Sequence, residues 1–228
     1  MDIIYEDNHL LVVIKPQNIP TQADSSHDED MLTKVKEYIK TKYNKQGNVY
    51  VGLVHRLDRP TGGVMVFAKT SKCASRLTEQ IKNGEMTKKY LAVTVGAPRE
   101  KRAKLVNYLL KNDKTNTVSV VPQLTTGAKY AELEYNVLDS NSKVALVDVN
   151  LVTGRSHQIR VQLKTIGCPI YGDVRYGGNT LAKGHNLALW AYCLRFVHPT
   201  TKQVMNFKVY PPVEQVPFSV FKNVIETL

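Results

Sequence analysis

Cysteine is scarce in this chain, and its spacing excludes two kinds of structural support. The 228 residues include three cysteines, Cys73, Cys168 and Cys193, which lie far apart and have no nearby Cys or His at metal-ligand spacing. An odd and dispersed set of thiols is typical of a protein in a reducing compartment. We therefore expect no disulfide and no metal site.

Long apolar runs are also missing. No window approaches the roughly eighteen apolar residues of a membrane-spanning helix, and Asp2, Glu6 and Asp7 stand where a signal peptide carries positive charge. We expect a cytoplasmic protein without membrane attachment. The 43% hydrophobic content is that of an ordinary globular protein, and no repeat or linker interrupts the chain. We expect one domain over residues 1–228.

Acidic residues are few, and the resulting positive charge is unevenly distributed. The formal net charge is +11 at pH 7. From Lys69 to Lys114, twelve Lys or Arg residues stand against four acids, which leaves +8 in that segment. A concentrated basic surface is typical of a protein with a polyanionic partner, nucleic acid before membrane. A solvated basic face kept for solubility is the alternative.

The hydrophobic pattern predicts an α+β fold with a mixed, largely antiparallel sheet and flanking helices. We expect Asp30 and Ser156 to cap two of the helices. A basic connection is expected over 98–104, followed by an antiparallel meander over 105–151. The predicted helices span residues 31–42, 72–82, 156–166 and 218–226. The predicted strands span residues 3–7, 10–16, 49–54, 64–68, 88–96, 105–110, 117–121, 129–138, 144–151, 187–194 and 205–209.

One stretch, residues 55–63, concentrates rare residue types between two apolar runs. It places Asp58 on a loop with three basic neighbours, His55, Arg56 and Arg59. Nearby positive charge favours the ionised form of a carboxylate. The pair Gly62-Gly63 permits close approach of another backbone or of a ligand. A turn that holds a structural ion pair explains the same residues, and local chemistry leaves both readings open.

Two later segments add groups suited to a nucleotide. Segment Lys88–Tyr90 places an aromatic hydroxyl beside two lysines on a predicted strand. Arg155, His157 and Arg160 gather at the predicted start of a helix, where the backbone already favours anions. Metal clusters, phosphate loops and a Ser/His/Asp order are missing. An enzyme with this inventory can act on a nucleotide within RNA through an aspartate and without a cofactor.

The order of these segments resembles the RluA-type pseudouridine synthases along nearly the whole chain. Residues His55–Asp58 with Thr61-Gly62-Gly63 resemble the catalytic motif of that family. Residues Lys88–Ala92 resemble its tyrosine motif, and Gly154–Arg160 its arginine motif. The pair Gly172-Asp173 and the segment Leu187–Leu189 follow in the family's order.

The resemblance implies isomerisation of uridine to pseudouridine, in which the bond to N1 breaks, the uracil turns and C5 is joined to the sugar. By this resemblance Asp58 is the catalytic carboxylate, Tyr90 stacks on the uracil and helps remove the C5 proton, and Arg160 keeps Asp58 ionised. Arg56 fills the space left by the flipped base, and Leu189 lies against that base. The other expected RNA-contacting residues are His55, Lys88, Lys89, Arg155 and His157.

The expected partner is structured RNA, ribosomal or transfer, bound by a monomer. Because the isomerisation is redox-neutral and keeps the uracil, no cofactor and no metal are expected. Three departures bear on substrate choice: relatives often have Ser at the position of Gly63 and His at the position of Trp190, and many carry a small N-terminal RNA-binding domain that we do not expect in this protein. Two alternatives are a non-catalytic RNA-binding or ribosome-assembly protein, and a nucleoside glycosidase with Asp173 as a second carboxylate.

Overall fold

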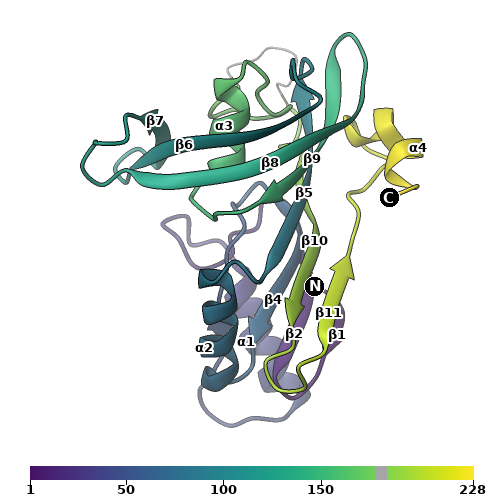
Figure 1. The fold of residues 1–228 in the computed structure, drawn as a ribbon. Helices are drawn as coiled ribbons and strands as arrows, with labels where there is room; N and C mark the ends of the chain where they lie inside the picture. Colours follow the sequence, from purple (N-terminus) through teal and green to yellow (C-terminus); the bar gives the residue numbers. More distant parts are fainter. Residues whose placement is uncertain (178–183) are drawn as a thin grey trace. The chain divides into compact units, whose positions relative to one another are not determined.

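The computed structural model describes residues 1–177 and 184–228, and Figure 1 labels most of its elements. The helices are α1 (Met31–Lys42), α2 (Ser71–Lys82), α3 (Gln158–Thr165) and α4 (Lys222–Ile225), with a 3-10 helix η2 (Phe218–Phe221) before α4. The strands are β1 (Asp2–Glu6), β2 (Leu10–Lys15), β3 (Gly52–Leu53), β4 (Gly62–Ala68), β5 (Thr87–Val95), β6 (Arg102–Asn112), β7 (Thr117–Val121), β8 (Lys129–Ser140), β9 (Val144–Leu151), β10 (Leu189–Val197) and β11 (Val204–Lys208).

The chain forms two compact units, each made of two segments. Unit 1 consists of residues 1–87 and 191–209, and unit 2 consists of residues 88–190 and 210–228. The predicted α+β class is confirmed, because helices accompany strand pairs that are antiparallel in both units. Among the described residues, no helix has the length and hydropathy needed to cross a membrane.

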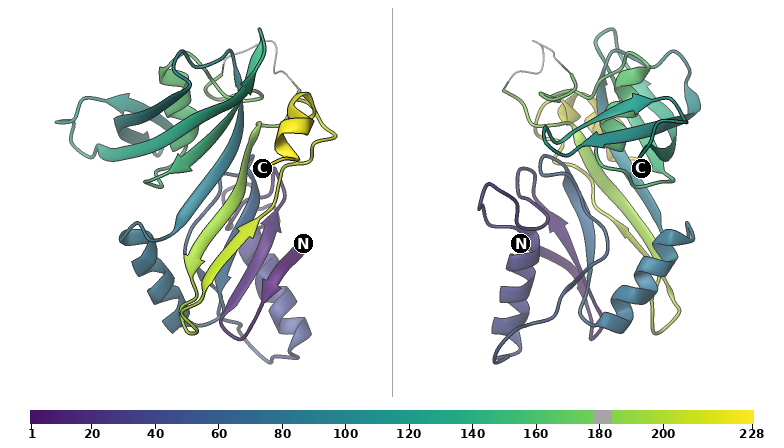
Figure 2. Two further views of the ribbon diagram at one scale, coloured as in Figure 1. Left: turned by 45° about the vertical axis from the view of Figure 1, so that its right-hand side comes forward. Right: turned by 90° about the vertical axis from the view of Figure 1, so that its left-hand side faces the viewer.

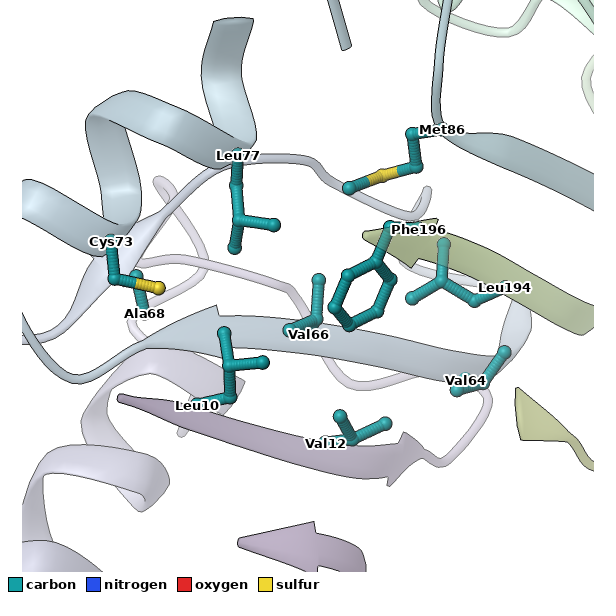
Figure 3. Close-up of a cluster of buried hydrophobic side chains, with 10 residues drawn as sticks. All are labelled: Leu10, Val12, Val64, Val66, Ala68, Cys73, Leu77, Met86, Leu194 and Phe196. Carbon is teal, nitrogen blue, oxygen red and sulfur yellow. The ribbon is translucent and has the colours of Figure 1, made fainter. Parts of the chain in front are cut away.

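In unit 1 the strands follow the order β1-β2-β4-β10, with β3 paired to β4 and β11 to β10. Every residue of β4 and most of β2 are buried, so both faces of these strands must be covered. Figure 2 shows α1 and α2 on opposite sides of them. On the α2 side, Cys73 and Leu77 join apolar side chains of β2, β4 and β10 in the cluster drawn in Figure 3.

Gly63 shows why two of these strands can lie so close together. Its φ is +127°, and a Cβ atom built there would lie 2.6 Å from the Ala191 amide nitrogen, and closer still to the carbonyl oxygen of Ala191. The expected close approach is therefore that of another backbone, on β10. The glycine pair belongs to the start of β4 and not to the Asp58 loop.

In unit 2 the strands follow the order β5-β9-β8-β6-β7. The prediction of a simple meander was wrong, because β8 lies between β6 and β9 and leaves β7 at the edge. Helix α3 packs against β6 and β7 (Figure 1), and Val161 of α3 joins Leu109, Val118 and Tyr176 in a small core.

Several predicted boundaries also need correction. Residues expected as a basic connection already form strand from Arg102, and the expected strand over 49–54 is reduced to the two residues of β3. Asp30 caps α1 as predicted, by accepting a hydrogen bond from the Thr33 amide. Ser156 does not cap α3, which begins two residues later behind His157 in a left-handed conformation. The sequence also predicts a glycine-punctuated loop over 171–178, and its last residue, Gly178, lies outside the described residues.

Candidate active site

Lys15 fixes the loop that carries Asp58 from inside unit 1. This lysine ends the apolar strand β2 and is 0% exposed. Its Nζ donates to the carbonyl oxygens of Pro16 at 2.9 Å, Ile19 at 2.6 Å and Arg59 at 3.0 Å. An ammonium group has three protons, and these three carbonyls accept them all. The residue after Asp58 is thereby tied to the end of β2.

Three further hydrogen bonds hold the main chain of the same loop. Thr21 Oγ1 donates to the Leu57 carbonyl at 2.8 Å, and Gln17 Nε2 donates to the Pro60 carbonyl at 3.0 Å. Within the loop, the Thr61 amide donates to the Asp58 carbonyl at 2.9 Å, which closes a turn around Pro60. The backbone on both sides of Asp58 is therefore fixed, while the Asp58 side chain is half-buried and Arg56 is exposed.

Two of the three basic neighbours expected beside Asp58 have other contacts. The Arg59 guanidinium reaches Asp28, and its Nη1 donates to Ser26 Oγ at 2.9 Å. His55 Nε2 accepts the Val66 amide at 3.1 Å. This contact continues the pairing of β3 with β4 after β3 ends, so the His55 ring supports β4. The Arg59 side chain thus binds the loop over residues 24–28.

Within unit 1, the charge of Asp58 interacts with the buried amino group of Lys15. Burial lowers the pKa of Lys15 from its ordinary value of 10.5 to about 7, and the Asp58 charge opposes this shift. Thr61, on the same loop, has a buried hydroxyl whose Oγ1 is the one buried polar side-chain atom of the described residues without a hydrogen-bond partner. A buried hydroxyl without a partner costs free energy, so it is suited to a group that arrives with a ligand.

Strand β5 carries Tyr90 and its two lysines in unit 2. Tyr90 is 6% exposed and pairs across the strands with Val149 of β9. Lys89 forms an ion pair with Asp148 at 3.4 Å. Burial lowers the pKa of Lys88, and the positive charge of Arg155 lowers it further. Lys88 and Arg155 therefore lie near enough to favour an anion that neutralises both.

The Arg155–Arg160 segment differs from the predicted helix start. Arg155 is exposed, and its Nε donates to the Tyr130 carbonyl of β8 at 2.8 Å. His157 stands before the first turn of α3 with φ at 52°. Its Nδ1 lies 2.7 Å from Tyr176 Oη. The side chains are therefore placed by contacts to other segments of unit 2, and not by a capping hydroxyl at Ser156.

Arg160 is buried and paired with a carboxylate that the family motifs did not assign to it. Its Nε and Nη2 each donate to one oxygen of Asp173, both at 2.8 Å. Asp173 Oδ1 also accepts the amides of Arg175 and Tyr176, each at 3.1 Å. A carboxylate with four donors and no exposed side-chain surface is a poor second acid or base. This disfavours the glycosidase alternative, which needs Asp173 for catalysis.

The expected catalytic and RNA-contacting residues are divided between the units. Unit 1 holds Asp58, Arg56 and His55, and unit 2 holds all the others. Leu189 is 3% exposed, and the Val93 amide of β5 donates to Ala188 beside it. The walls expected around the uracil thus come from neighbouring backbone segments of unit 2. The ion pair between Arg160 and Asp58 stays a prediction.

Three residues escaped sequence reasoning: Lys15, Asp173 in its pairing role, and Tyr176. Lys15 left a weak signal, because it follows five apolar residues and precedes a proline, a position where a lysine is expected at the surface. No sequence signal indicates the pairing of Asp173 with Arg160 or the contacts of Tyr176, because these residues are brought together only by the fold.

Comparison with known proteins agrees with the sequence motifs. A family model described as RNA pseudouridylate synthase matches residues 9–165. The chain is 32% identical to "Uncharacterized RNA pseudouridine synthase YhcT" of Bacillus subtilis (strain 168), over 100% of this chain and 72% of that protein. It is 34% identical to "Ribosomal large subunit pseudouridine synthase C" of Vibrio vulnificus (strain CMCP6), over 94% of this chain and 66% of that protein.

The same fold occurs among solved structures. "Human RNA Pseudouridylate Synthase Domain Containing 4" matches with a TM-score of 0.79 and 25% identity, and covers 99% of this chain and 93% of that one. "Human RNA Pseudouridylate Synthase Domain Containing 1" matches with a TM-score of 0.73, 98% and 94% coverage and 21% identity, a likeness of fold alone.

Proposed function

The chain belongs to the RNA pseudouridylate synthase family, and from that premise we propose that it isomerises specific uridines of structured RNA to pseudouridine through Asp58. The observation that carries the proposal is the fixed backbone on both sides of Asp58, together with the buried cation of Lys15 that acts on it. A catalytic carboxylate needs this kind of rigid support, because misplaced groups lose rate steeply.

The isomerisation leaves the composition of the nucleotide unchanged. The bond from the ribose C1′ to N1 breaks, a bond from C1′ to C5 forms, C5 loses its proton and N1 gains one. Asp58 is the ionised carboxylate of this sequence of steps, and Arg160 keeps it ionised. Tyr90 stacks on the uracil and helps remove the C5 proton, and Leu189 lies against the base. The burial of Tyr90 and Leu189 supports these roles, because an apolar wall excludes water from the base.

The substrate is RNA from which the target base is turned out of its stack. The exposed side chain of Arg56, next to the half-buried Asp58, supports a role in occupying the space that the base leaves. The closeness of the Lys88 and Arg155 charges supports a role of both side chains in holding a phosphate. Two relatives are named ribosomal large subunit pseudouridine synthase C, so we place large-subunit ribosomal RNA first among the substrates and transfer RNA second.

Release of tritium from RNA labelled at uridine C5 tests the proposal, since the label must leave with the C5 proton. Asp58→Asn should lower the release rate by about 10²–10⁴-fold, the range of a lost acid–base group. Asp139→Asn, at an exposed carboxylate of β8, is the matched control and should keep the wild-type rate. Failure of the wild-type protein to release tritium from total cellular RNA would refute the proposed function.

A further inference from the structure

Asp173 fixes the guanidinium of Arg160 in one plane. Two parallel charge-assisted hydrogen bonds, both 2.8 Å long, join the Nε–Nη2 edge to the carboxylate. The carboxylate is itself fixed, because it accepts two backbone amides of the turn that begins at Asp173 and because the Gly177 amide donates to the Asp173 carbonyl at 2.7 Å. Arg160 therefore meets an acceptor whose position is set by the backbone.

Tyr176 meets Arg160 from a second direction. Its ring centroid lies 5.0 Å from the Arg160 guanidinium carbon, a distance at which the ring face attracts the cation. Its hydroxyl accepts the Val118 amide of the edge strand β7 at 2.8 Å. The same hydroxyl lies 2.7 Å from His157 Nδ1, with the two rings edge to face. One side chain thus touches β7, the segment before α3, and α3 itself.

The hydrogen bonds of Tyr176 also favour one of the two neutral tautomers of His157. Burial raises the pKa of Tyr176, so the hydroxyl keeps its proton. A hydroxyl has one proton to donate, and with Val118 as its donor this proton finds an acceptor in His157 Nδ1. The proton of a neutral His157 then lies on Nε2.

We propose that Tyr176 is a positioning residue of the isomerisation: with Asp173 it holds the orientation of Arg160, and it fixes His157 as the Nε2–H tautomer. This inference rests on the proposed function, because the orientation of Arg160 affects the rate only if Arg160 acts on Asp58. Stability alone does not require the arrangement. A buried ion pair is often no more stabilising than an apolar pair of similar volume, so its retention fits a demand for fixed geometry.

Two substitutions distinguish the contribution of the Tyr176 ring from that of its hydroxyl. Tyr176→Leu removes both, and we expect kcat for tritium release to fall by about 10²-fold. The acidic limb of the kcat/KM profile should also move to higher pH by about one unit, because a displaced cation stabilises the Asp58 carboxylate less. Tyr176→Phe keeps the ring under Arg160 and should restore the wild-type limb. In the described part of the chain, the other charged or titratable groups near Tyr176 are His157, Asp173, Arg175 and Lys164, the last of which lines a shallow hollow together with Tyr176.

The matched control is Tyr135→Phe, at another buried tyrosine of unit 2, whose hydroxyl donates to the Glu100 carbonyl. It should lower Tm without moving the acidic limb. A folded Tyr176→Leu variant whose limb coincides with that of the wild type would overturn the positioning role. In that case tritium release by the wild-type protein and its loss in Asp58→Asn would leave the proposed function standing.

A second measurement tests the His157 tautomer and requires neither enzyme activity nor a folded Tyr176→Leu variant. Nitrogen-15 NMR of the imidazole rings should report the Nε2–H tautomer for His157 in the wild-type protein, and a loss of that preference in Tyr176→Phe. Observation of the Nδ1–H tautomer in the wild-type protein would refute the assigned direction of the hydrogen bond. This holds whether or not the protein modifies RNA.

Discussion

The Asp58 loop of unit 1 is held through its main chain, whereas Arg160 of unit 2 is held through its side chain. In the loop, Lys15, Thr21 and Gln17 donate to carbonyl oxygens of residues 57, 59 and 60. At Arg160, a carboxylate and an aromatic ring contact the guanidinium itself. One region fixes the path of the backbone, and the other fixes the orientation of a charge.

This difference matches what each residue has to do under the proposed function. A loop supported through its carbonyl groups does not depend on its own side chains, so Arg56 and Asp58 can face a substrate. A guanidinium that tunes a neighbouring charge needs a fixed plane, because electrostatic effects depend on distance and orientation. We therefore expect side-chain changes in the Asp58 loop to alter activity more than stability, and changes to its main-chain supports to alter both.

The largest expected effect comes from Gly63→Ala, which breaks the backbone arrangement of unit 1. The added methyl group would meet the backbone of Ala191 well inside van der Waals contact, and φ at +127° is unfavourable for alanine. We expect urea unfolding to show a loss of about 4 kcal/mol. Gly84→Ala is the control, because φ there is +73° but nothing lies within 4 Å; it should cost about 1 kcal/mol. Equal losses in the two variants would contradict the close approach of β4 and β10.

Lys15→Met should have the next largest effect. Methionine fills the volume but removes the shared donor of three carbonyl groups, of which only that of Arg59 keeps a second donor among the described residues, the Asn18 amide at 2.8 Å, so we expect a loss of about 3 kcal/mol. Activity should fall as well, since the Arg59 carbonyl beside Asp58 loses one of its two donors. Lys36→Met, on the exposed face of α1, is the control and should change neither quantity. A stable but inactive Lys15→Met variant would assign Lys15 to the chemistry and not to the loop.

The pH dependence of the free energy of unfolding tests the lowered pKa of Lys15 separately. Its pKa is about 7 in the folded protein against 10.5 ordinarily. Between these values the unfolded chain binds more protons at this position, so the free energy of unfolding should rise with pH across that window. The Lys15 contribution should be on the order of 1 kcal/mol per pH unit, and Lys15→Met should lack it. Parallel curves for the two proteins would show that burial does not lower this pKa.

Local patterns predicted what depends on neighbouring residues and missed what depends on distant ones. The continuous apolar run over residues 10–14 and the cap at Asp30 predicted β2 and α1 nearly to the residue, because both follow from chemistry within a few positions. The start of α3 was missed, since the left-handed conformation of His157 has no sequence signal and Tyr176 lies 19 residues away. The family motifs identified Asp58 and Arg160 as candidates. The residues that hold them, Lys15 and Asp173, are known only from the fold.

The smallest expected effect separates the two arginines beside Asp58. Arg59→Gln removes exposed contacts to Ser26 and Asp28, so Tm should hardly change and tritium release should stay within about threefold of the wild-type rate. Arg56→Gln, at the other exposed arginine of the loop, should lower kcat/KM by about tenfold or more while Tm stays the same. Equal kinetic losses in the two variants would mean that Arg59 acts on the substrate or on Asp58. The side chains of the loop would then contribute to fixing Asp58, and the contrast with Arg160 would fail.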